Sequence, residues 1–151
     1  MKGLSDGEQK IVEQAIGILD SYLRTELVTF HEPCAVKIYL RLKLAKLDRE
    51  QFNCLYLDSQ HRLIVDEVLF MGSLDACNVF PRIVVQNALK HNAAAVIFAH
   101  NHPSGVPDPS RADRAITERL QSALALVDVK VLDHIVVGDP EMTSFAERGW
   151  L

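Results

Sequence analysis

Residues 93–113 read AAAVIFAHNHPSGVPDPSRAD, and this stretch decides how the rest of the chain is arranged. Residues 93–99 are continuously apolar without alternation, which predicts a central strand buried on both faces. Residues 101–109 are rich in Pro, Ser and Gly and cannot form regular structure. Ser110 then begins a helix that runs to about Leu126. The stretch therefore predicts a buried strand, an irregular loop and a helix.

The sequence on either side predicts further helices alternating with strands. Before the stretch we expect a helix at 6–24, a linker at 24–31, a helix at 33–47, a strand hairpin at 52–57 and 62–70, an irregular connection at 72–79 and a helix at 81–90. After it we expect a strand at 129–137 and a short amphipathic tail at 142–151. This order predicts an α/β fold in which a mixed β-sheet is flanked by helices.

The two helices nearest the N-terminus have recognisable starts and apolar faces. Ser5 and Glu8 have the spacing of a capping box, and Pro33 suits the first turn of the second helix. The residues of the first helix that share one face at helical spacing are Ile11, Ala15, Ile18, Leu19 and Tyr22. Those of the second helix that share one side are Val36, Tyr39, Leu40 and Lys43.

Composition indicates one ordinary globular chain of 151 residues, with 48% hydrophobic and 24% charged residues. The formal net charge of −4 does not favour a phosphate-binding surface, so nucleic acid is a possible partner that charge does not support. Three cysteines lie far apart, at Cys34, Cys54 and Cys77, which favours reduced thiols acting as small apolar fillers. With no apolar signal region in MKGLSDGEQK and no apolar run of ~20 residues, we expect a cytoplasmic protein without a membrane partner.

The most informative residues for chemistry are His100, His102 and Asp113. Residues two apart in an extended chain point to the same side, so the two imidazoles can converge on one point. Asp113 lies in the first turn of the next helix, which the intervening loop would bring back over the strand end. Three protein ligands and one open position are typical of a catalytic zinc site. Ser110 and Asp113 also have the spacing of a capping box, which is compatible with ligation because the cap would fix the helix start.

The pattern H-x-H-x7-S-x2-D resembles that of the JAMM (JAB/MPN) metalloproteins. The surrounding runs NAAAVIFAHNHPSG, PSRAD and VLDHIVVGD resemble the bacterial RadC-type JAB domain. The resemblance extends over about Phe30–Leu151, and the chain looks like a short RadC homologue. It implies an N-terminal helical segment at 1–29, followed at 30–151 by a JAB/MPN domain with a cytidine-deaminase-like fold.

The resemblance also implies a zinc hydrolase that cuts peptide or isopeptide bonds in a peptide or protein substrate. His100, His102 and Asp113 would hold Zn²⁺, and Ser110 would bind the oxyanion or the metal-bound water. A glutamate would be the general base that activates this water for attack on the amide. Glu50, just before QFNCLYL, is best placed for that role, and Glu67 on the second strand of the hairpin is its rival.

Two other functions need consideration. A zinc deaminase would need H-x-E with P-C-x-x-C, and neither pattern is present. A non-catalytic RadC-like module would act in DNA repair or recombination through protein or nucleic-acid binding.

Asp133 and His134 lie in an apolar strand, where they are either partners of a metal-bound histidine or a satisfied core pair. The motifs specify neither a particular substrate nor an oligomeric state.

Overall fold

The computed structural model describes residues 3–25, 33–72 and 79–151. The elements in these ranges are α1 (Asp6–Leu23), α2 (Pro33–Leu44), β1 (Gln51–Leu57), β2 (Leu63–Met71), α3 (Pro81–Lys90), β3 (Ala95–Asn101), α4 (Arg111–Ala125), β4 (Lys130–Val137) and β5 (Met142–Ser144). Within the described residues, the strands form one five-stranded sheet of order β2-β1-β3-β4-β5. Strands β3 and β4 are parallel and the other neighbours are antiparallel, which confirms the predicted α/β fold with a mixed sheet.

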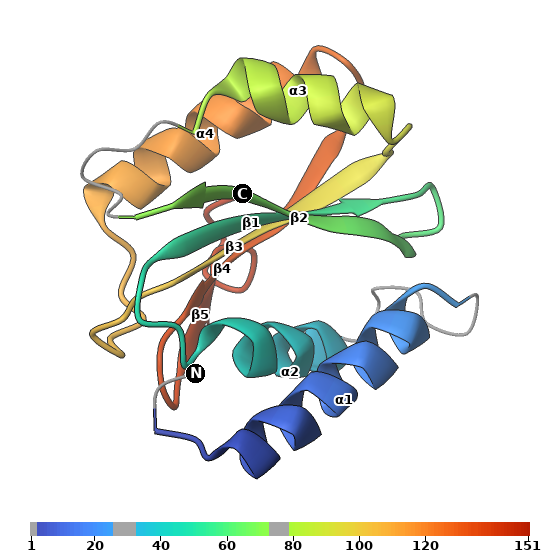
Figure 1. The fold of residues 1–151 in the computed structure, drawn as a ribbon. Coiled ribbons are helices and arrows are strands. Elements are labelled where there is room, and N and C mark those ends of the chain that lie inside the picture. The colour runs from blue at the N-terminus through green and yellow to red at the C-terminus, as the bar shows by residue number, and fades with distance from the viewer. Residues whose placement is uncertain (1–2, 26–32, 73–78) are drawn as a thin grey trace.

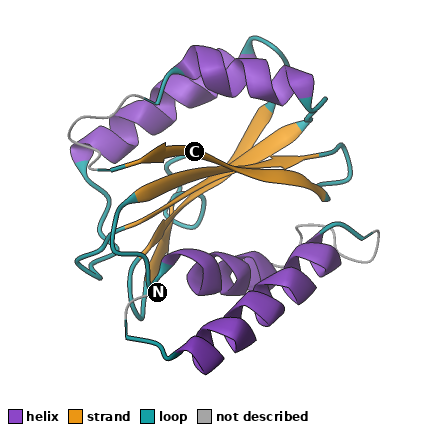
Figure 2. Ribbon diagram, in the orientation of Figure 1, coloured by secondary structure: helices purple, strands orange, loops and turns teal. Residues whose placement is uncertain are grey.

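Helices cover both faces of the sheet, so the molecule has three layers (Figures 1 and 2). One apolar core lies between the sheet and α1 and α2, and it includes Tyr39 and Leu55. The other lies between the sheet and α3 and α4, and it includes Val84 and Phe98. Successive residues of the central strands point into the two cores in turn. Strands β1 and β3 are therefore buried along their whole length.

Strand β3 continues two residues beyond the predicted end and includes His100. His100 is opposite Phe52 of β1 and Val136 of β4, so the strands on both sides supply backbone partners. A polar side chain at a strand end does not stop the ladder when both neighbours continue. The imidazole of His100 is therefore held rigidly inside the sheet, with no exposed surface.

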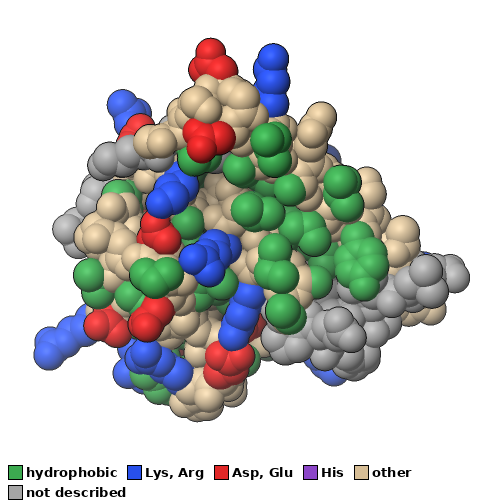
Figure 3. All heavy atoms as spheres, turned by 90° about the horizontal axis from the view of Figure 1, so that it is seen from below, with side chains coloured by type: hydrophobic (Ala, Val, Ile, Leu, Met, Phe, Trp, Pro, Cys, Tyr) green, Lys and Arg blue, Asp and Glu red, His purple; other side chains and the backbone are tan. Residues whose placement is uncertain are grey.

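Helix α1 packs with only part of the face that its periodicity suggested, since Leu19 of that face contacts the core. Ile11, Ile18 and Tyr22 are exposed, at 66%, 70% and 45% of their possible surface. Ile16 and Leu23, which lie outside the predicted face, pack toward the core beside Leu19. The helix has apolar residues on both sides, and α2 covers only one of them. Figure 3, which shows the molecule from below, has hydrophobic side chains gathered on this face beside lysines and arginines.

Other local expectations had mixed outcomes. The capping boxes at Ser5 and at Ser110 are both present. The tail that was expected to be amphipathic begins instead with β5, because its backbone pairs with β4. Cys54 is buried as expected, whereas Cys34 is exposed, so the filler role was wrong for Cys34. Cys77 and the predicted division between residues 29 and 30 fall outside the described ranges. No helix in the described part of the chain is long and apolar enough to cross a membrane.

Candidate metal centre

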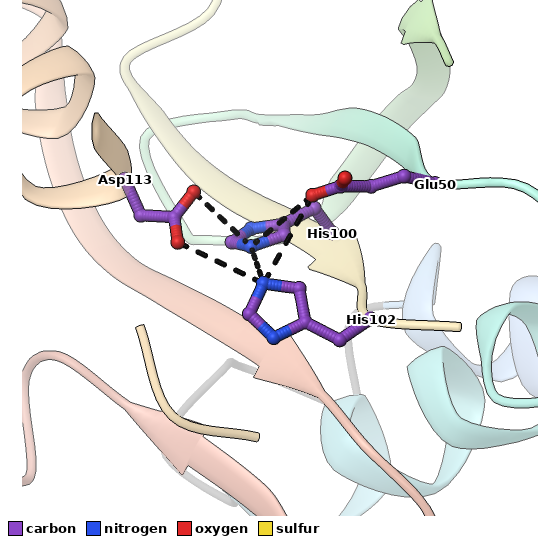
Figure 4. Close-up of side chains that lie close together, drawn as sticks. All are labelled: Glu50, His100, His102 and Asp113. Carbon is purple, nitrogen blue, oxygen red and sulfur yellow. Dashed lines mark hydrogen bonds and ion pairs between the residues drawn. The ribbon is translucent and has the colours of Figure 1, made fainter. Parts of the chain in front are cut away.

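Four side chains from separate parts of the chain converge at one end of the sheet (Figure 4). Glu50 immediately precedes β1, His100 lies in β3, His102 follows it, and Asp113 is in the first turn of α4. One possible ligand atom from each of the four lies within 4.8 Å of the others. The structure thus brings together the three residues expected to be ligands and the glutamate expected to be the base. The cluster could hold a metal ion.

The spacing of the three ligand groups suits a single ion. The Nε2 atoms of His100 and His102 are 3.0 Å apart. The nearest carboxylate oxygens of Asp113 lie 3.4 Å from the first of these atoms and 3.7 Å from the second. In a tetrahedral zinc site with bonds of about 2.0–2.1 Å, ligand atoms are about 3.3 Å apart. The observed separations lie on either side of that value.

Two features of the cluster are unfavourable unless a proton or a cation lies among these groups. Two imidazole nitrogens at 3.0 Å repel through their lone pairs unless a proton or a cation lies between them. Oδ1 of Asp113 is buried and has no hydrogen-bond partner among the described residues, since its contact with His100 lacks hydrogen-bond geometry. A buried carboxylate oxygen without a partner costs free energy that a bound cation would recover. The donor set therefore fits a metal ion.

The electrostatics of the site keep Asp113 ionised. Burial alone would raise the pKa of its carboxyl group, but the imidazoles of His100 and His102 hold this pKa well below its usual range. The carboxylate of Asp113 in turn affects the protonation of His102. The nearby carboxylate of Asp113 raises the pKa of His102. Protons and a metal ion consequently compete for the same lone pairs.

Ser110 has a clear structural role at the start of α4. Its backbone N–H and its hydroxyl both donate to Oδ2 of Asp113, at 2.6 and 2.7 Å. Its Oγ accepts in turn from the backbone N–H of Asp113, at 3.1 Å. This capping box uses Oδ2 of the carboxylate and leaves Oδ1 facing the imidazole of His100. Capping and ligation are therefore compatible in this geometry.

The backbone around Glu50 is fixed by a residue that the sequence analysis missed. Oδ1 of Asn101 accepts from the N–H of Gln51 at 2.8 Å, and its Nδ2 donates to the carbonyl of Arg49 at 3.1 Å. The carbonyl of Glu50 accepts from Gly72 at 2.8 Å. These bonds place Oε1 of Glu50 at 3.9 Å from Nε2 of both histidines. The only signal in the sequence was the place of Asn101 between the two histidines, which directs it to the opposite side of β3.

Glu67, the rival glutamate, is bound elsewhere. It lies on β2, where Oε1 contacts Nε2 of His91 at 2.7 Å and Oε2 accepts from Asn87 at 2.8 Å. It is not among the residues of the cluster. The geometry therefore favours Glu50 over Glu67 as the acid nearest to the candidate metal.

Asp133 and His134 face in different directions, which separates the two interpretations left open for them. Nε2 of His134 lies 2.8 Å from Nδ1 of His100, directly behind the cluster. The carboxylate of Asp133 instead accepts from Ser144 at 2.6 Å and from the N–H of Ala146 at 3.0 Å. His134 thus contacts a candidate ligand, while Asp133 stabilises the turn after β5.

A mixed sheet between helices, with H-x-H at the end of a central strand and Ser-x-x-Asp at the start of the next helix, defines the JAMM class of domain. The family model described as the RadC-like JAB domain matches residues 30–150, and the chain belongs to this family.

Curated relatives agree with this assignment. A UPF0758 protein of Vibrio cholerae serotype O1 is 52% identical over 153 residues, which cover 99% of this chain and 68% of the relative. Another UPF0758 protein of that species is 56% identical over 145 residues, covering 95% of this chain and 90% of the relative. A UPF0758 protein of Cellvibrio japonicus is 62% identical over 119 residues, or 79% of this chain and 53% of the relative.

Proposed function

We propose that this chain is a zinc-dependent hydrolase of the JAMM type, a metallopeptidase or isopeptidase acting on a peptide or protein substrate. The observation that carries the proposal is the buried carboxylate of Asp113, whose Oδ1 faces His100 without a hydrogen bond among the described residues and whose Oδ2 faces His102. Two nitrogens and one carboxylate oxygen form a ligand set used by catalytic zinc sites. Membership of the RadC-like JAB domain family supports the same chemistry.

In this proposal Nε2 of His100, Nε2 of His102 and the carboxylate of Asp113 hold the ion. Bound zinc supplies Lewis acidity, which acidifies a water molecule and polarises an amide carbonyl. The side chains of His100 and Asp113 are fully buried, whereas those of His102 and Glu50 are 18% and 14% exposed. A substrate would therefore approach from the side of Glu50 and His102.

Glu50 is the proposed general base. From its position beside both histidines, its carboxylate can take a proton from the attacking water and deliver it to the leaving amine nitrogen. Ser110 orients Asp113 through the capping box. For Ser110 to donate directly to a developing oxyanion, as the family resemblance implies, its hydroxyl would have to release Oδ2 of Asp113.

The decisive experiment uses Glu50→Gln. Zinc is quantified in purified protein, and hydrolysis is measured on peptide and isopeptide libraries with and without chelator. We expect one zinc per chain in wild type and variant, and a loss of turnover of about 10²–10⁴-fold in the variant. Glu67→Gln is the matched control, because it makes the same change in a glutamate that lies outside the cluster. This variant should retain both zinc and turnover. Undiminished hydrolysis by Glu50→Gln would remove Glu50 from the mechanism.

A second function is a non-catalytic module that acts in DNA repair or recombination through protein or nucleic-acid binding. The specific observation in its favour is that Glu50 lies close enough to complete a four-ligand group. Four protein ligands are typical of closed, structural zinc sites. In that case Glu50→Gln would lose zinc affinity, and no chelator-sensitive hydrolysis would be found. A DNA titration at several salt concentrations tests nucleic acid, since phosphate binding would weaken steeply with salt.

A further inference from the structure

We propose that His134 is a positioning residue for the metal centre, which holds the ring of His100 in the tautomer that presents an unprotonated Nε2 to a cation. This inference rests on the proposed metal site, and it concerns binding of the ion rather than hydrolysis. It gives a role to a buried polar side chain that the proposed mechanism does not use.

A continuous chain of hydrogen bonds connects two of the candidate ligands behind the cluster. Nδ1 of His100 lies 2.8 Å from Nε2 of His134. Nδ1 of His134 lies 2.6 Å from Oγ1 of Thr117, whose hydroxyl contacts the backbone carbonyl of Asp113 at 2.5 Å. The chain therefore begins at one candidate ligand, His100, and ends on the backbone of another, Asp113. All four residues are buried, so water does not compete for these bonds.

The donors and acceptors allow one assignment of protons along this chain when the rings are neutral. The carbonyl of Asp113 can only accept, so the hydroxyl of Thr117 donates to it. Since that hydroxyl has one hydrogen, Oγ1 must accept from Nδ1 of His134. A neutral ring protonated at Nδ1 has its lone pair on Nε2, which then accepts from Nδ1 of His100. His100 is left with a lone pair on Nε2, the atom that faces His102 and Asp113.

Among the described residues, the ring of His134 is hydrogen-bonded to His100 and Thr117 and is otherwise packed against aromatic side chains. Aromatic rings lie around it, with centroids at 5.3 Å for Phe52, 6.1 Å for Phe98 and 4.7 Å for Phe145. An apolar environment disfavours a charged imidazole, which supports the neutral assignment. The same rings limit rotation of His134. The result is an acceptor of fixed position for Nδ1 of His100.

Three substitutions separate positioning from packing. His134→Phe keeps an aromatic ring and removes the acceptor. The amide of asparagine superposes on the Nδ1 side of the imidazole, so His134→Asn can still reach Thr117 but not His100. The amide of glutamine superposes on the Nε2 side, so His134→Gln can still accept from His100.

The test measures zinc affinity of metal-free protein by competition with a chromophoric chelator, and the free energy of unfolding of the same samples in urea. We expect His134→Phe and His134→Asn to lower zinc affinity about 10–100-fold, and His134→Gln to restore most of it. His91→Gln is the matched control, because His91 bonds to Glu67 outside the cluster, and its zinc affinity should equal that of wild type. Equal affinity in all folded variants would overturn the inference, as would affinities that only follow stability.

A measurement on the unmodified chain covers the case in which variants fail to fold. Long-range ¹H–¹⁵N correlation spectra of ¹⁵N-labelled protein report which ring nitrogen carries the hydrogen. We expect His134 to be neutral and protonated at Nδ1, and protonation at Nε2 would overturn the assignment. If wild type binds no zinc, this inference and the proposed function both fail. If it binds zinc but hydrolyses nothing, weakened binding by His134→Asn still supports the inference.

Discussion

Replacing Asn101 by alanine should destabilise the protein and disorder the general base without removing the metal. Asn101 is 1% exposed and makes two hydrogen bonds to the backbone on either side of Glu50. Each bond is worth about 0.5–1.5 kcal/mol, and a buried N–H left without an acceptor costs about 1–3 kcal/mol. We therefore expect Asn101→Ala to lower the free energy of unfolding by about 2–4 kcal/mol, which a typical domain with about 5–15 kcal/mol survives.

The functional part of this prediction follows from the same contacts. Once these bonds are lost, Glu50 is no longer held at 3.9 Å from the histidines, and a misplacement of about 1 Å can reduce turnover about 10²-fold. Zinc affinity should change less than turnover, because the two lost bonds involve none of the three ligands and the pairing of β3 with β1 and β4 still holds His100.

Urea unfolding can be followed by the fluorescence of Trp150, the one tryptophan in the sequence. Asn53→Ala is the matched control, since Asn53 is buried and also makes two bonds, but to the side chains of Gln51 and Asp66. Asn53→Ala should lose a similar free energy of unfolding but keep more turnover than Asn101→Ala. If the two variants had equal turnover, Asn101 would have no special relation to Glu50.

Three further perturbations test the site and the loop beside it. Ser110→Ala should lower the free energy of unfolding by about 1–2 kcal/mol, more than Ser5→Ala, because Ser110 bonds to the buried carboxylate of Asp113 whereas Ser5 bonds to the exposed Glu8; equal losses in urea would contradict this difference. In metal-free protein the lowered pKa of Asp113 adds stability that is lost as pH falls below the ordinary aspartate value of about 4, and the raised pKa of His102 adds stability that is lost as pH rises above the ordinary histidine value of about 6.5. Asp113→Asn should therefore flatten the dependence of unfolding free energy on pH, and an unchanged profile would show that the pair contributes nothing. Gly138→Ala should cost about 1–3 kcal/mol because a Cβ there would lie 2.4 Å from the carbonyl oxygen of Gly105. Gly17→Ala, in open space on α1, should be neutral or stabilising by up to about 1 kcal/mol.

The sequence predicted the parts of the fold in which one pattern dominates. The continuous apolar run before His100 predicted a strand buried on both faces, and the loop and capping box after it predicted the helix that carries Asp113. Convergence of His100, His102 and Asp113 followed from these local features, because strand alternation and a short loop leave few other arrangements.

The sequence could not predict features that depend on contacts between distant segments. Helix α1 has apolar residues on both sides, so periodicity could not show that Ile11 and Ile18 would remain exposed. Asn101 fixes Glu50 across 50 positions of sequence, and no local motif marks an amide that bonds to a backbone in another strand. The contact of His134 with His100 likewise required the parallel pairing of β3 and β4.

The two carboxylate oxygens of Asp113 have different roles. Oδ2 caps helix α4, and Oδ1 remains available for a metal ion. Formation of helix α4 thus orients the carboxylate that would bind the ion before any ion is present. Small zinc fingers, by contrast, stay unfolded until their metal binds. A chain organised in this way should be able to give up its metal to a chelator and recover it on dilution, with the same backbone throughout. Loading then becomes a reversible exchange governed by the supply of metal rather than a step in folding.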